Sequence, residues 1–478
     1  MNHRFNFQIK HLKASLWLIW CIRFVCLFQT PVMDQTESRY SEIARKMLEL
    51  GNWVTPFHDY GVPFWGKPPL AIWSSALSMK LLGVSEWSER LPHFIFGILI
   101  VVLLFLWVKR LIDSHHAWLT IALLSSFLPF YVATGAVMTD ICLLLTITIA
   151  MISFYQCITA NNRYWGFGFF IALGIGLLAK GPIMVVLTVM PCFIWLLLAG
   201  QLRRLKQLPW LLGPIITLVI SVPWYLLAEY KTPGFLNYFL IGEHLYRFLV
   251  PGWQGDLYGF AHQHALGSIW IYAIVSLLPI SLIGIAYLSL YRIPIKQWLT
   301  TKASLEGFLF AWFLSPLLFF TFSKNIIWPY LLPILPPLAV LISQILIKRQ
   351  VRIKFIISQA LLWPIIILVL WVILLLCPDK SPSTHKSIAT KIHQRWPQHR
   401  IYLCQPNHFS WAFYSEGMIN PFFCPKDKSV KLKQFKYPLL LMIRTADLQT
   451  YPLKNKIKCQ SISFDQNYYL CEYHSIEK

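Results

Sequence analysis

The side chains best suited to chemistry gather in a polar stretch, residues 32–91, between two apolar runs. Asp34, Glu37 and Arg39 open this stretch, and Lys67 follows within a Gly-Lys-Pro-Pro run. A carboxylate can take the proton of an attacking hydroxyl, whereas Arg and Lys can hold a phosphate and stabilise it as it leaves. These residue types predict group transfer from a phosphate-linked substrate.

Each of these residues also has a structural alternative. The spacing of apolar residues predicts an amphipathic helix over 36–50, ended by Gly51 and lying in the membrane interface. Asp34 and Glu37 are placed where a capping box would begin this helix, a role that is compatible with acid–base chemistry. Lys67 can be an ordinary interface lysine, although the two prolines after it restrict the backbone and favour a fixed position.

The composition defines the kind of protein that must position these residues. The 478-residue chain is 56% hydrophobic and only 13% charged, where a soluble protein would carry about 25% charge. Apolar runs of ~20 residues recur, which predicts an α-helical polytopic membrane protein. Much of the net charge of +22 lies in short loops between these runs, which favours contact with anionic lipid over nucleic acid.

Eleven membrane-spanning helices are predicted. We read the first apolar run as a retained span, because no small-residue cleavage site follows it. With a cytoplasmic N-terminus, every inside loop carries Lys or Arg, as the positive-inside rule requires, and residues 378–478 lie outside. The predicted spans are 14–31, 92–111, 117–134, 137–158, 164–180, 182–199, 209–228, 265–291, 305–322, 326–347 and 354–377.

This topology brings the charged residues to one face of the membrane. An ion-coupled transporter would place ionisable residues near the bilayer midplane, but the span interiors here are nearly free of charge. The pattern favours an enzyme whose substrate has a lipid tail and a phosphate-linked head. We expect His244 to be structural, because no second metal ligand stands at a telling spacing. The outer-face residues are Asp34, Glu37, Arg39, Lys67, Asp140, Lys180, Glu243, Arg247, Lys324 and Tyr330.

In combination these motifs resemble the GT-C superfamily of integral-membrane glycosyltransferases, near the 4-amino-4-deoxy-L-arabinose lipid A transferases and more distantly the protein O-mannosyltransferases. The resemblance covers about residues 20–345. It is carried by TESRYSEIARKM, GNWVTP, GKPPL and SEWSERLP in family order, then by Thr139-Asp140, Lys180-Gly181-Pro182, Pro223-Trp224-Tyr225, the Glu243–Phe248 run and the segment from Phe322 to Pro337.

The resemblance implies a function and a set of site residues. Such enzymes transfer a sugar from a polyprenyl phosphate, commonly undecaprenyl phosphate in bacteria, with inversion on the extracytoplasmic face. It implies Asp34 or Glu37 as the acid at the reaction centre, and Arg39, Lys67 and Arg247 as cations near the donor phosphate. It also implies Asp140 and Lys180 at the pocket, with Tyr330 as part of its wall.

Two motifs depart from the family pattern. The family has adjacent Asp-Glu before its Arg-Tyr pair; here Thr36 precedes Glu37 and the aspartate is displaced to Asp34, so both acids stay candidates, with Asp34 favoured. Gly66 replaces a glutamate that can help hold a metal in relatives, so we predict no metal there and no cofactor. Because that glutamate is also a plausible sugar contact, the sugar that this protein transfers can differ from the sugar that its relatives transfer.

We therefore expect a transmembrane catalytic domain over 1–377, with the 32–91 loop as its catalytic part, and a small periplasmic α/β domain over 378–478. In the tail, strands are expected at Ile401–Cys404, Pro438–Ile443 and Tyr468–Glu472, and helices near 383–396 and 407–416. Its cysteines, Cys404, Cys424, Cys459 and Cys471, permit three disulfide pairings. The expected function is sugar transfer from a polyprenyl phosphate to a lipid A-type or other envelope acceptor at the bacterial inner membrane. The alternatives are a flippase of lipid-linked saccharide and a membrane scaffold.

Overall fold

The structure is a computed structural model that describes residues 2–258, 263–281, 301, 304–349, 353–376, 385–395, 401–403, 409–421, 439–444, 457–462 and 465–473. The chain divides into two compact units: a helical unit, Met1–Gln29 with Asn52–Trp371, and a tail unit, Thr30–Gly51 with Val372–Lys478. The first part of the 32–91 stretch therefore folds with the tail.

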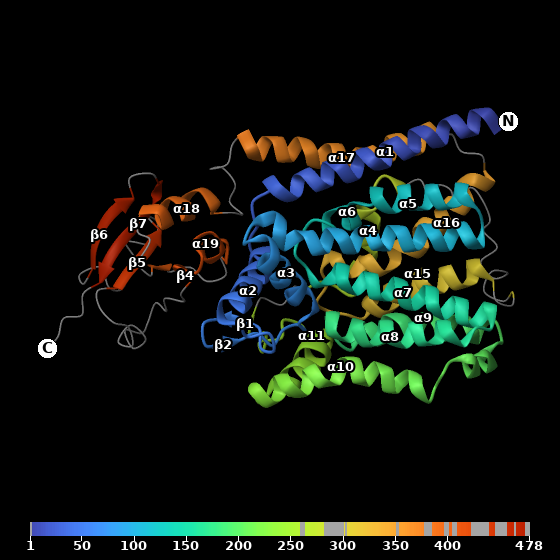
Figure 1. Ribbon diagram of the computed structural model, residues 1–478, viewed down its shortest axis with the longest axis horizontal. Helices are drawn as coiled ribbons and strands as arrows, with labels where there is room; N and C mark the ends of the chain where they lie inside the picture. Colours follow the sequence, from blue (N-terminus) through green and yellow to red (C-terminus); the bar gives the residue numbers. More distant parts are fainter. Residues whose placement is uncertain are drawn as a thin grey trace. The chain divides into compact units, whose positions relative to one another are not determined.

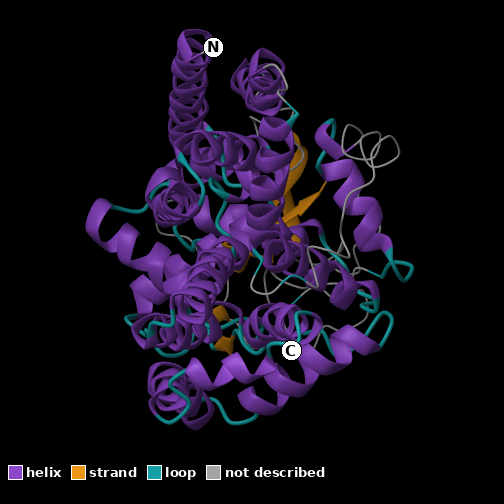
Figure 2. Ribbon diagram, turned by 90° about the vertical axis from the view of Figure 1, so that its right-hand side faces the viewer, coloured by secondary structure: helices purple, strands orange, loops and turns teal. Residues whose placement is uncertain are grey.

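The helical unit is a bundle of long helices that run roughly side by side in Figure 1 and are viewed along the bundle in Figure 2. Its elements are α1 (Asn2–Gln29), α3 (Leu70–Leu82), α4 (Glu86–Leu111), α5 (Ser114–Ser126), α6 (Leu128–Ala133), α7 (Thr139–Ala160), α8 (Arg163–Lys180), α9 (Ile183–Leu198), η1 (Leu202–Gln207), α10 (Leu212–Lys231), η2 (Asn237–Tyr246), α11 (Arg247–Leu249), α12 (Ser268–Ser276), α15 (Leu305–Thr321), η3 (Trp328–Ile334) and α16 (Leu335–Lys348). Helix α17 (Ile353–Leu376) follows, and β1 (Phe57–Asp59) pairs with β2 (Val62–Pro63) in a short hairpin.

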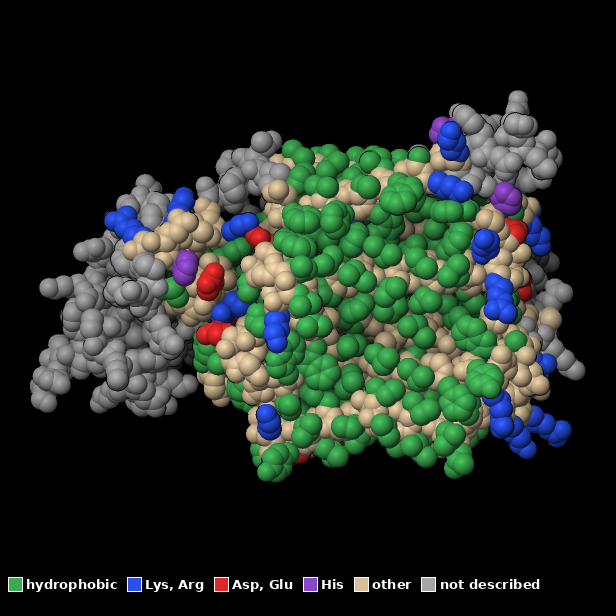
Figure 3. Space-filling model, in the orientation of Figure 1, with side chains coloured by type: hydrophobic (Ala, Val, Ile, Leu, Met, Phe, Trp, Pro, Cys, Tyr) green, Lys and Arg blue, Asp and Glu red, His purple; other side chains and the backbone are tan. Residues whose placement is uncertain are grey.

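Several of these helices have the length and composition of membrane spans. Within the described residues five qualify: Lys10–Gln29, Glu86–Leu111, Thr139–Ala160, Leu212–Lys231 and Trp328–Lys348; shorter apolar helices accompany them. Apolar side chains cover the visible face of the helical unit, and Lys and Arg gather at the end where α1 begins (Figure 3). The prediction of a polytopic helical membrane protein is confirmed, whereas the count of eleven spans stays a prediction.

Local sequence signals explain where the bundle helices begin and end. The Ser85 side chain accepts from the backbone N–H of Ser88 at the start of α4, a capping box, and Lys109 and Arg110 occupy its last turn. At the start of α5 the Asp113 side chain accepts from the backbone N–H groups of His115 and His116. Polar caps and basic last turns therefore mark where these apolar helices begin and end.

A cluster of aromatic rings lies in the mostly aliphatic interior of the bundle. Trp195 packs edge-on against Phe308 with ring centroids 5.0 Å apart and stacks on Tyr155 at 5.7 Å. Phe308 and Trp312 are fully buried in the same cluster. Such interlocking rings make a rigid support for the residues at the helix ends.

The tail unit is built on a mixed sheet in the order β4-β3-β5-β7-β6. Its strands are β3 (Ile401–Leu403), β4 (Ile419–Pro421), β5 (Leu439–Arg444), β6 (Ile457–Ile462) and β7 (Asp465–Tyr473); its helices are α2 (Thr36–Leu50), α18 (Lys386–Arg395) and α19 (Phe409–Tyr414). Strands β3, β5 and β7 coincide with the three expected strands, whereas β4 and β6 were not expected. The register sets Cys459 opposite Cys471; Cys404 and Cys424 lie outside the described residues.

Candidate active site

Two of the predicted pocket residues, Asp140 and Lys180, meet where α7 begins and α8 ends. Asp140 lies in the first turn of α7 and Lys180 is the last residue of α8. An acid at a helix N-terminus and a base at a C-terminus both complement the helix dipole. Lys180 Nζ donates to Asp140 Oδ1 at 2.5 Å, and each side chain is only 11% exposed. Lys180 Nζ also lies 4.8 Å from the centroid of the Tyr330 ring.

The Lys180-Gly181-Pro182 motif makes a tight turn between α8 and α9. Gly181 has φ +79°, a backbone conformation that side chains rarely adopt. A Cβ added there would lie 2.6 Å from the ring of Phe239 and 3.1 Å from His244 Nε2. The glycine therefore lets the segment around η2 approach the turn that carries Lys180.

Lys67 is held in a loop pinned from two sides. The Trp65 backbone N–H donates to the Tyr258 hydroxyl at 3.0 Å, and the Trp65 indole N–H donates to Thr232 Oγ1 at 3.1 Å. Lys67 Nζ donates to Gly66 O at 2.6 Å and to Glu243 Oε2 at 2.9 Å. The expectation of a fixed position for Lys67 is consistent with these contacts.

Glu243 joins two of the predicted phosphate-binding cations. Its Oε2 accepts from Lys67 Nζ and from Arg247 NH1, both at 2.9 Å, while Oε1 accepts from the Tyr238 hydroxyl at 3.2 Å. Arg247 NH2 also lies 3.5 Å from Asp256 Oδ2. The Glu243 side chain is 2% exposed, so the buried carboxylate is balanced by two cations.

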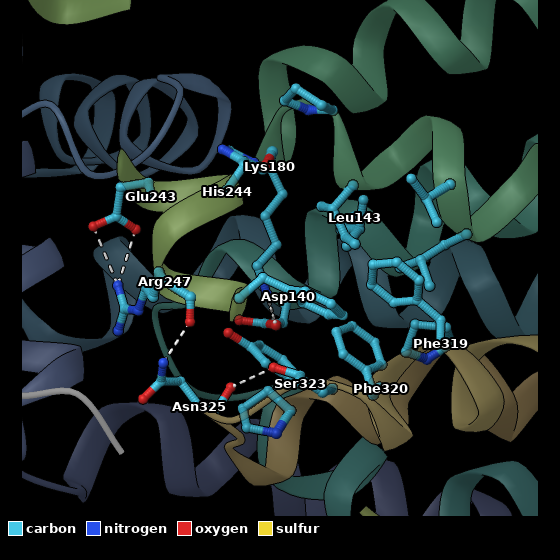
Figure 4. A pocket seen from close by; sticks show the side chains of 18 of the residues that line it. Asp140, Leu143, Lys180, Glu243, His244, Arg247, Phe319, Phe320, Ser323 and Asn325 are labelled. Atoms are coloured by element: carbon cyan, nitrogen blue, oxygen red, sulfur yellow. Dashed lines mark hydrogen bonds and ion pairs between the residues drawn. The ribbon is translucent and has the colours of Figure 1, made fainter. Parts of the chain in front are cut away.

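These residues line one pocket with a volume of about 190 Å³. Lys67, Lys180 and Arg247 all face it, and Tyr330 forms part of its wall. Figure 4 shows Glu243, Arg247 and Asn325 on one side and Leu143, Phe319 and Phe320 on the other. The charged lining holds three cations, Lys67, Lys180 and Arg247, against two carboxylates, Asp140 and Glu243, and apolar side chains form the other side. An excess of cations beside an apolar wall suits a phosphate attached to a hydrocarbon chain.

The electrostatic surroundings shift the pKa values of Glu243, Arg247 and His244 in η2 and α11. Burial raises the pKa of Glu243, but the charges of Lys67 and Arg247 outweigh it and lower that pKa to about 2. Burial lowers the pKa of Arg247, and the Glu243 charge reverses this and raises the pKa above its usual value. Burial also lowers the pKa of His244, although its ring nitrogens lie 2.7 Å from Phe239 O and 3.3 Å from Lys180 O, contacts that raise the pKa.

Asp34 belongs to the tail unit and is held there by α19 and the segment before α18. Its Oδ1 accepts from Ser38 Oγ at 2.5 Å and from the Ser410 backbone N–H at 3.0 Å. Its Oδ2 accepts from Ser410 Oγ at 2.5 Å and lies 3.3 Å from His385 Nδ1. The capping role considered for Asp34 is wrong, because Gln35 is the N-cap residue of α2 and no side chain caps the helix.

Glu37 and Arg39 lie on the first turns of α2, also in the tail unit. Glu37 Oε2 accepts from the Met33 backbone N–H at 3.2 Å, and the Arg39 guanidinium lies 5.4 Å from the Tyr40 ring centroid. The predicted helix over 36–50 ended by Gly51 is confirmed, with Gly51 at φ +64°. That Asp34, Glu37 and Arg39 act at the pocket stays a prediction.

The structure adds residues that were not predicted as part of the site. Glu243 was placed on the outer face without a role, although its i, i+4 spacing to Arg247 is the usual spacing of a helical ion pair. Asn325 donates through Nδ2 to Arg247 O and to Val250 O and so fixes α11. Nothing local in the sequence marks Asn325 for this role, because it acts across 78 residues.

Gly66, the departure from the family motif, is packed under two rings. A Cβ added at Gly66 would lie 3.0 Å from the Phe64 ring and 3.3 Å from the Tyr258 ring. A glutamate here would therefore require the rings to shift. Within the part of the chain that the structure describes, no group of three or more His, Cys, Asp and Glu is placed to hold a metal ion.

The amino-acid sequence is similar to a known family and to named bacterial proteins. The family model of dolichyl-phosphate-mannose-protein mannosyltransferases matches residues 11–239. The undecaprenyl phosphate-alpha-4-amino-4-deoxy-L-arabinose arabinosyl transferase of Yersinia pestis (strain Pestoides F) is 32% identical over 357 residues, which cover 70% of this chain and 60% of that protein. The Edwardsiella ictaluri (strain 93-146) protein of the same name is 29% identical over 348 residues, covering 69% of this chain and 59% of that protein. The chain thus spans about 60% of the length of the curated relatives it matches.

Solved structures share the fold. The crystal structure of ArnT from Cupriavidus metallidurans bound to undecaprenyl phosphate has a TM-score of 0.78 at 18% identity and covers 97% of this chain and 98% of that one. The archaeal oligosaccharyltransferase AglB from Archaeoglobus fulgidus, in complex with an inhibitory peptide and a dolichol-phosphate, has a TM-score of 0.50 at 12% identity and covers 96% of this chain and 74% of that one.

The chain belongs to the GT-C class of membrane glycosyltransferases. Within that class the chain is related to the undecaprenyl phosphate aminoarabinose transferases, and the resemblance inferred from its motifs is confirmed.

Proposed function

We propose that this protein is an inverting glycosyltransferase. It moves a sugar from a polyprenyl phosphate, undecaprenyl phosphate in bacteria, to a lipid A-type or other envelope acceptor. The observation that carries the proposal is the pocket in which Lys67, Lys180 and Arg247 surround a polar end while Leu143, Phe319 and Phe320 form an apolar wall. A phosphate with a hydrocarbon chain fits both halves.

The chemistry is a single displacement. The acceptor oxygen forms a bond to the anomeric carbon of the sugar, and the bond from that carbon to the phosphate oxygen breaks. The electron pair leaves with polyprenyl phosphate, whose growing charge Lys67, Arg247 and Lys180 stabilise. Asp34 or Glu37 takes the proton of the acceptor. Attack opposite the leaving phosphate inverts the anomeric carbon.

The topology follows from the basic loops. The N-terminus lies in the cytoplasm, and the pocket and the tail unit lie on the periplasmic side of the inner membrane. The donor then reaches the pocket from the membrane, with its chain along the apolar wall. The names of the relatives support undecaprenyl phosphate as the carrier and aminoarabinose as the first sugar to test.

The test is sugar transfer by the purified protein in liposomes. Labelled undecaprenyl-phosphate aminoarabinose and extracted envelope lipid are supplied, and label in the acceptor and released undecaprenyl phosphate are both measured. Transfer by wild type, lost in Lys67→Ala and in one of Asp34→Asn or Glu37→Gln, supports the proposal. Movement of intact donor across the bilayer without release of phosphate would identify a flippase instead.

A further inference from the structure

We propose that Glu243 is a positioning residue that holds Lys67 and Arg247 together as a single phosphate-binding pair before the donor arrives. The inference rests on the proposed function and extends it, because it assigns a role to a carboxylate that touches neither sugar nor acceptor in the proposed reaction. It is carried by one oxygen, Glu243 Oε2, that accepts from both cations at 2.9 Å.

The two cations come from distant parts of the chain. Arg247 lies four residues after Glu243, on the same run of helical turns, whereas Lys67 lies 176 residues earlier. Because both donate to the same oxygen, their nitrogens are within about 6 Å of each other, where like charges repel. A bridging anion is needed to keep the two side chains converged while the pocket is empty.

Glu243 itself has little freedom to move. The Tyr238 hydroxyl donates to its Oε1 at 3.2 Å, and its side chain is 2% exposed. Lys67 is the long, flexible partner, so the carboxylate determines where the ammonium lies and not the reverse. The low pKa of Glu243 keeps it an anion at every physiological pH.

The arrangement leaves room for the phosphate. An ammonium has three N–H donors, and within the described residues Lys67 uses two, toward Gly66 O and Glu243 Oε2. Arg247 uses NH1 on Glu243, and its NH2 faces Asp256 at 3.5 Å. A phosphate oxygen can therefore join the cations from the pocket side while Glu243 stays behind them.

The opposite role for Glu243 has a different signature. If Glu243 merely competed with the phosphate for the cations, removing its charge would strengthen donor binding. If it positions them, removing the charge lets Lys67 move away from Arg247 and weakens donor binding. The sign of the change in affinity therefore decides between the two roles.

The experiment measures binding of undecaprenyl phosphate and of uncharged undecaprenol to the full-length protein in detergent, together with transfer kinetics. Glu243→Gln is compared with Glu243→Asp and with the control Glu229→Gln, whose side chain accepts from Gly234 N and Leu236 N at the end of α10. We expect Glu243→Gln to bind undecaprenyl phosphate at least tenfold more weakly, with a raised donor KM and unchanged undecaprenol binding. Glu243→Asp should restore part of the affinity, and the control should bind as wild type does.

Two results overturn the inference and differ from failure of the proposed function. Equal or tighter binding of undecaprenyl phosphate by Glu243→Gln rules out positioning. An equal loss of undecaprenol binding would show that the substitution damages the pocket as a whole, and would rule it out too. If wild type itself does not prefer undecaprenyl phosphate to undecaprenol, the proposed function fails first.

Discussion

Removing one partner of the Lys180–Asp140 pair should harm the protein in two separable ways. Lys180→Met keeps the length of the side chain but leaves the Asp140 carboxylate without its partner. Loss of one member of a buried ion pair costs about 3–5 kcal/mol, and with each side chain 11% exposed we expect about 3 kcal/mol of lost stability. Lost contact with the donor phosphate should cost a further ~1.5–3 kcal/mol of transition-state binding, about 10- to 160-fold in kcat/KM.

Adding Asp140→Leu to Lys180→Met separates the two effects. An apolar pair of similar volume commonly replaces a buried ion pair at little cost, so the double variant should regain stability to within about 1 kcal/mol of wild type. It should not regain transfer, because the cation at the phosphate is still missing. Thermal unfolding in detergent and the liposome transfer assay measure the two quantities, with Lys109→Met, exposed in the last turn of α4, as control. Wild-type transfer by the double variant would refute a role for Lys180 at the phosphate.

Further outcomes are expected at other positions. Gly181→Ala should lower both stability and transfer, because Ala strains at φ +79° and its Cβ meets the Phe239 ring; normal thermal unfolding of this variant would contradict the account of the turn. The pKa of Glu243 is about 2 against an ordinary 4.5, so its ion pairs contribute stability above pH 4.5, and this stability is lost only as pH falls toward 2. The difference in unfolding temperature between wild type and Glu243→Gln should therefore be nearly the same at pH 5 and at pH 8. A difference that disappears at pH 5 would contradict this assignment. Ser410→Ala should reduce kcat for transfer with donor KM unchanged, because Ser410 holds Asp34. Ser415, a buried serine just after the other end of α19, is the control, and Ser415→Ala should leave kcat unchanged. Equal effects of the two substitutions would indicate destabilisation of the tail unit alone.

The sequence predicted the helices and strands of this fold better than the contacts between residues that are distant in the chain. Apolar runs with polar ends located the helices, and Gly51 at the end of an amphipathic pattern located the end of α2. The bridge from Lys67 to Glu243 was not predictable, because nothing local links residues that lie 176 positions apart. The placement of Asp34 against Ser410, 376 positions away, was missed for the same reason.

In the candidate site, likewise, single residues were predicted but the contacts between them were not. Lys67, Lys180 and Arg247 were identified from motifs, and all three line the pocket. The carboxylate that joins Lys67 to Arg247 was not identified, because a sequence shows charge on one face of the membrane but not which charges meet. The packing at Gly66 was only partly visible in the sequence, because Phe64 is a near neighbour whereas the second ring, Tyr258, comes from a distant part of the chain.

The most direct test of the central claim is release of undecaprenyl phosphate from labelled undecaprenyl-phosphate aminoarabinose by the reconstituted protein, measured in wild type and in Lys67→Ala. Lys80→Ala, an exposed lysine at the end of α3, is the matched control. We expect acceptor-dependent release by wild type and by the control, and a loss of at least tenfold in Lys67→Ala. Release at the wild-type rate by folded Lys67→Ala would contradict the assignment of this pocket as the donor phosphate site.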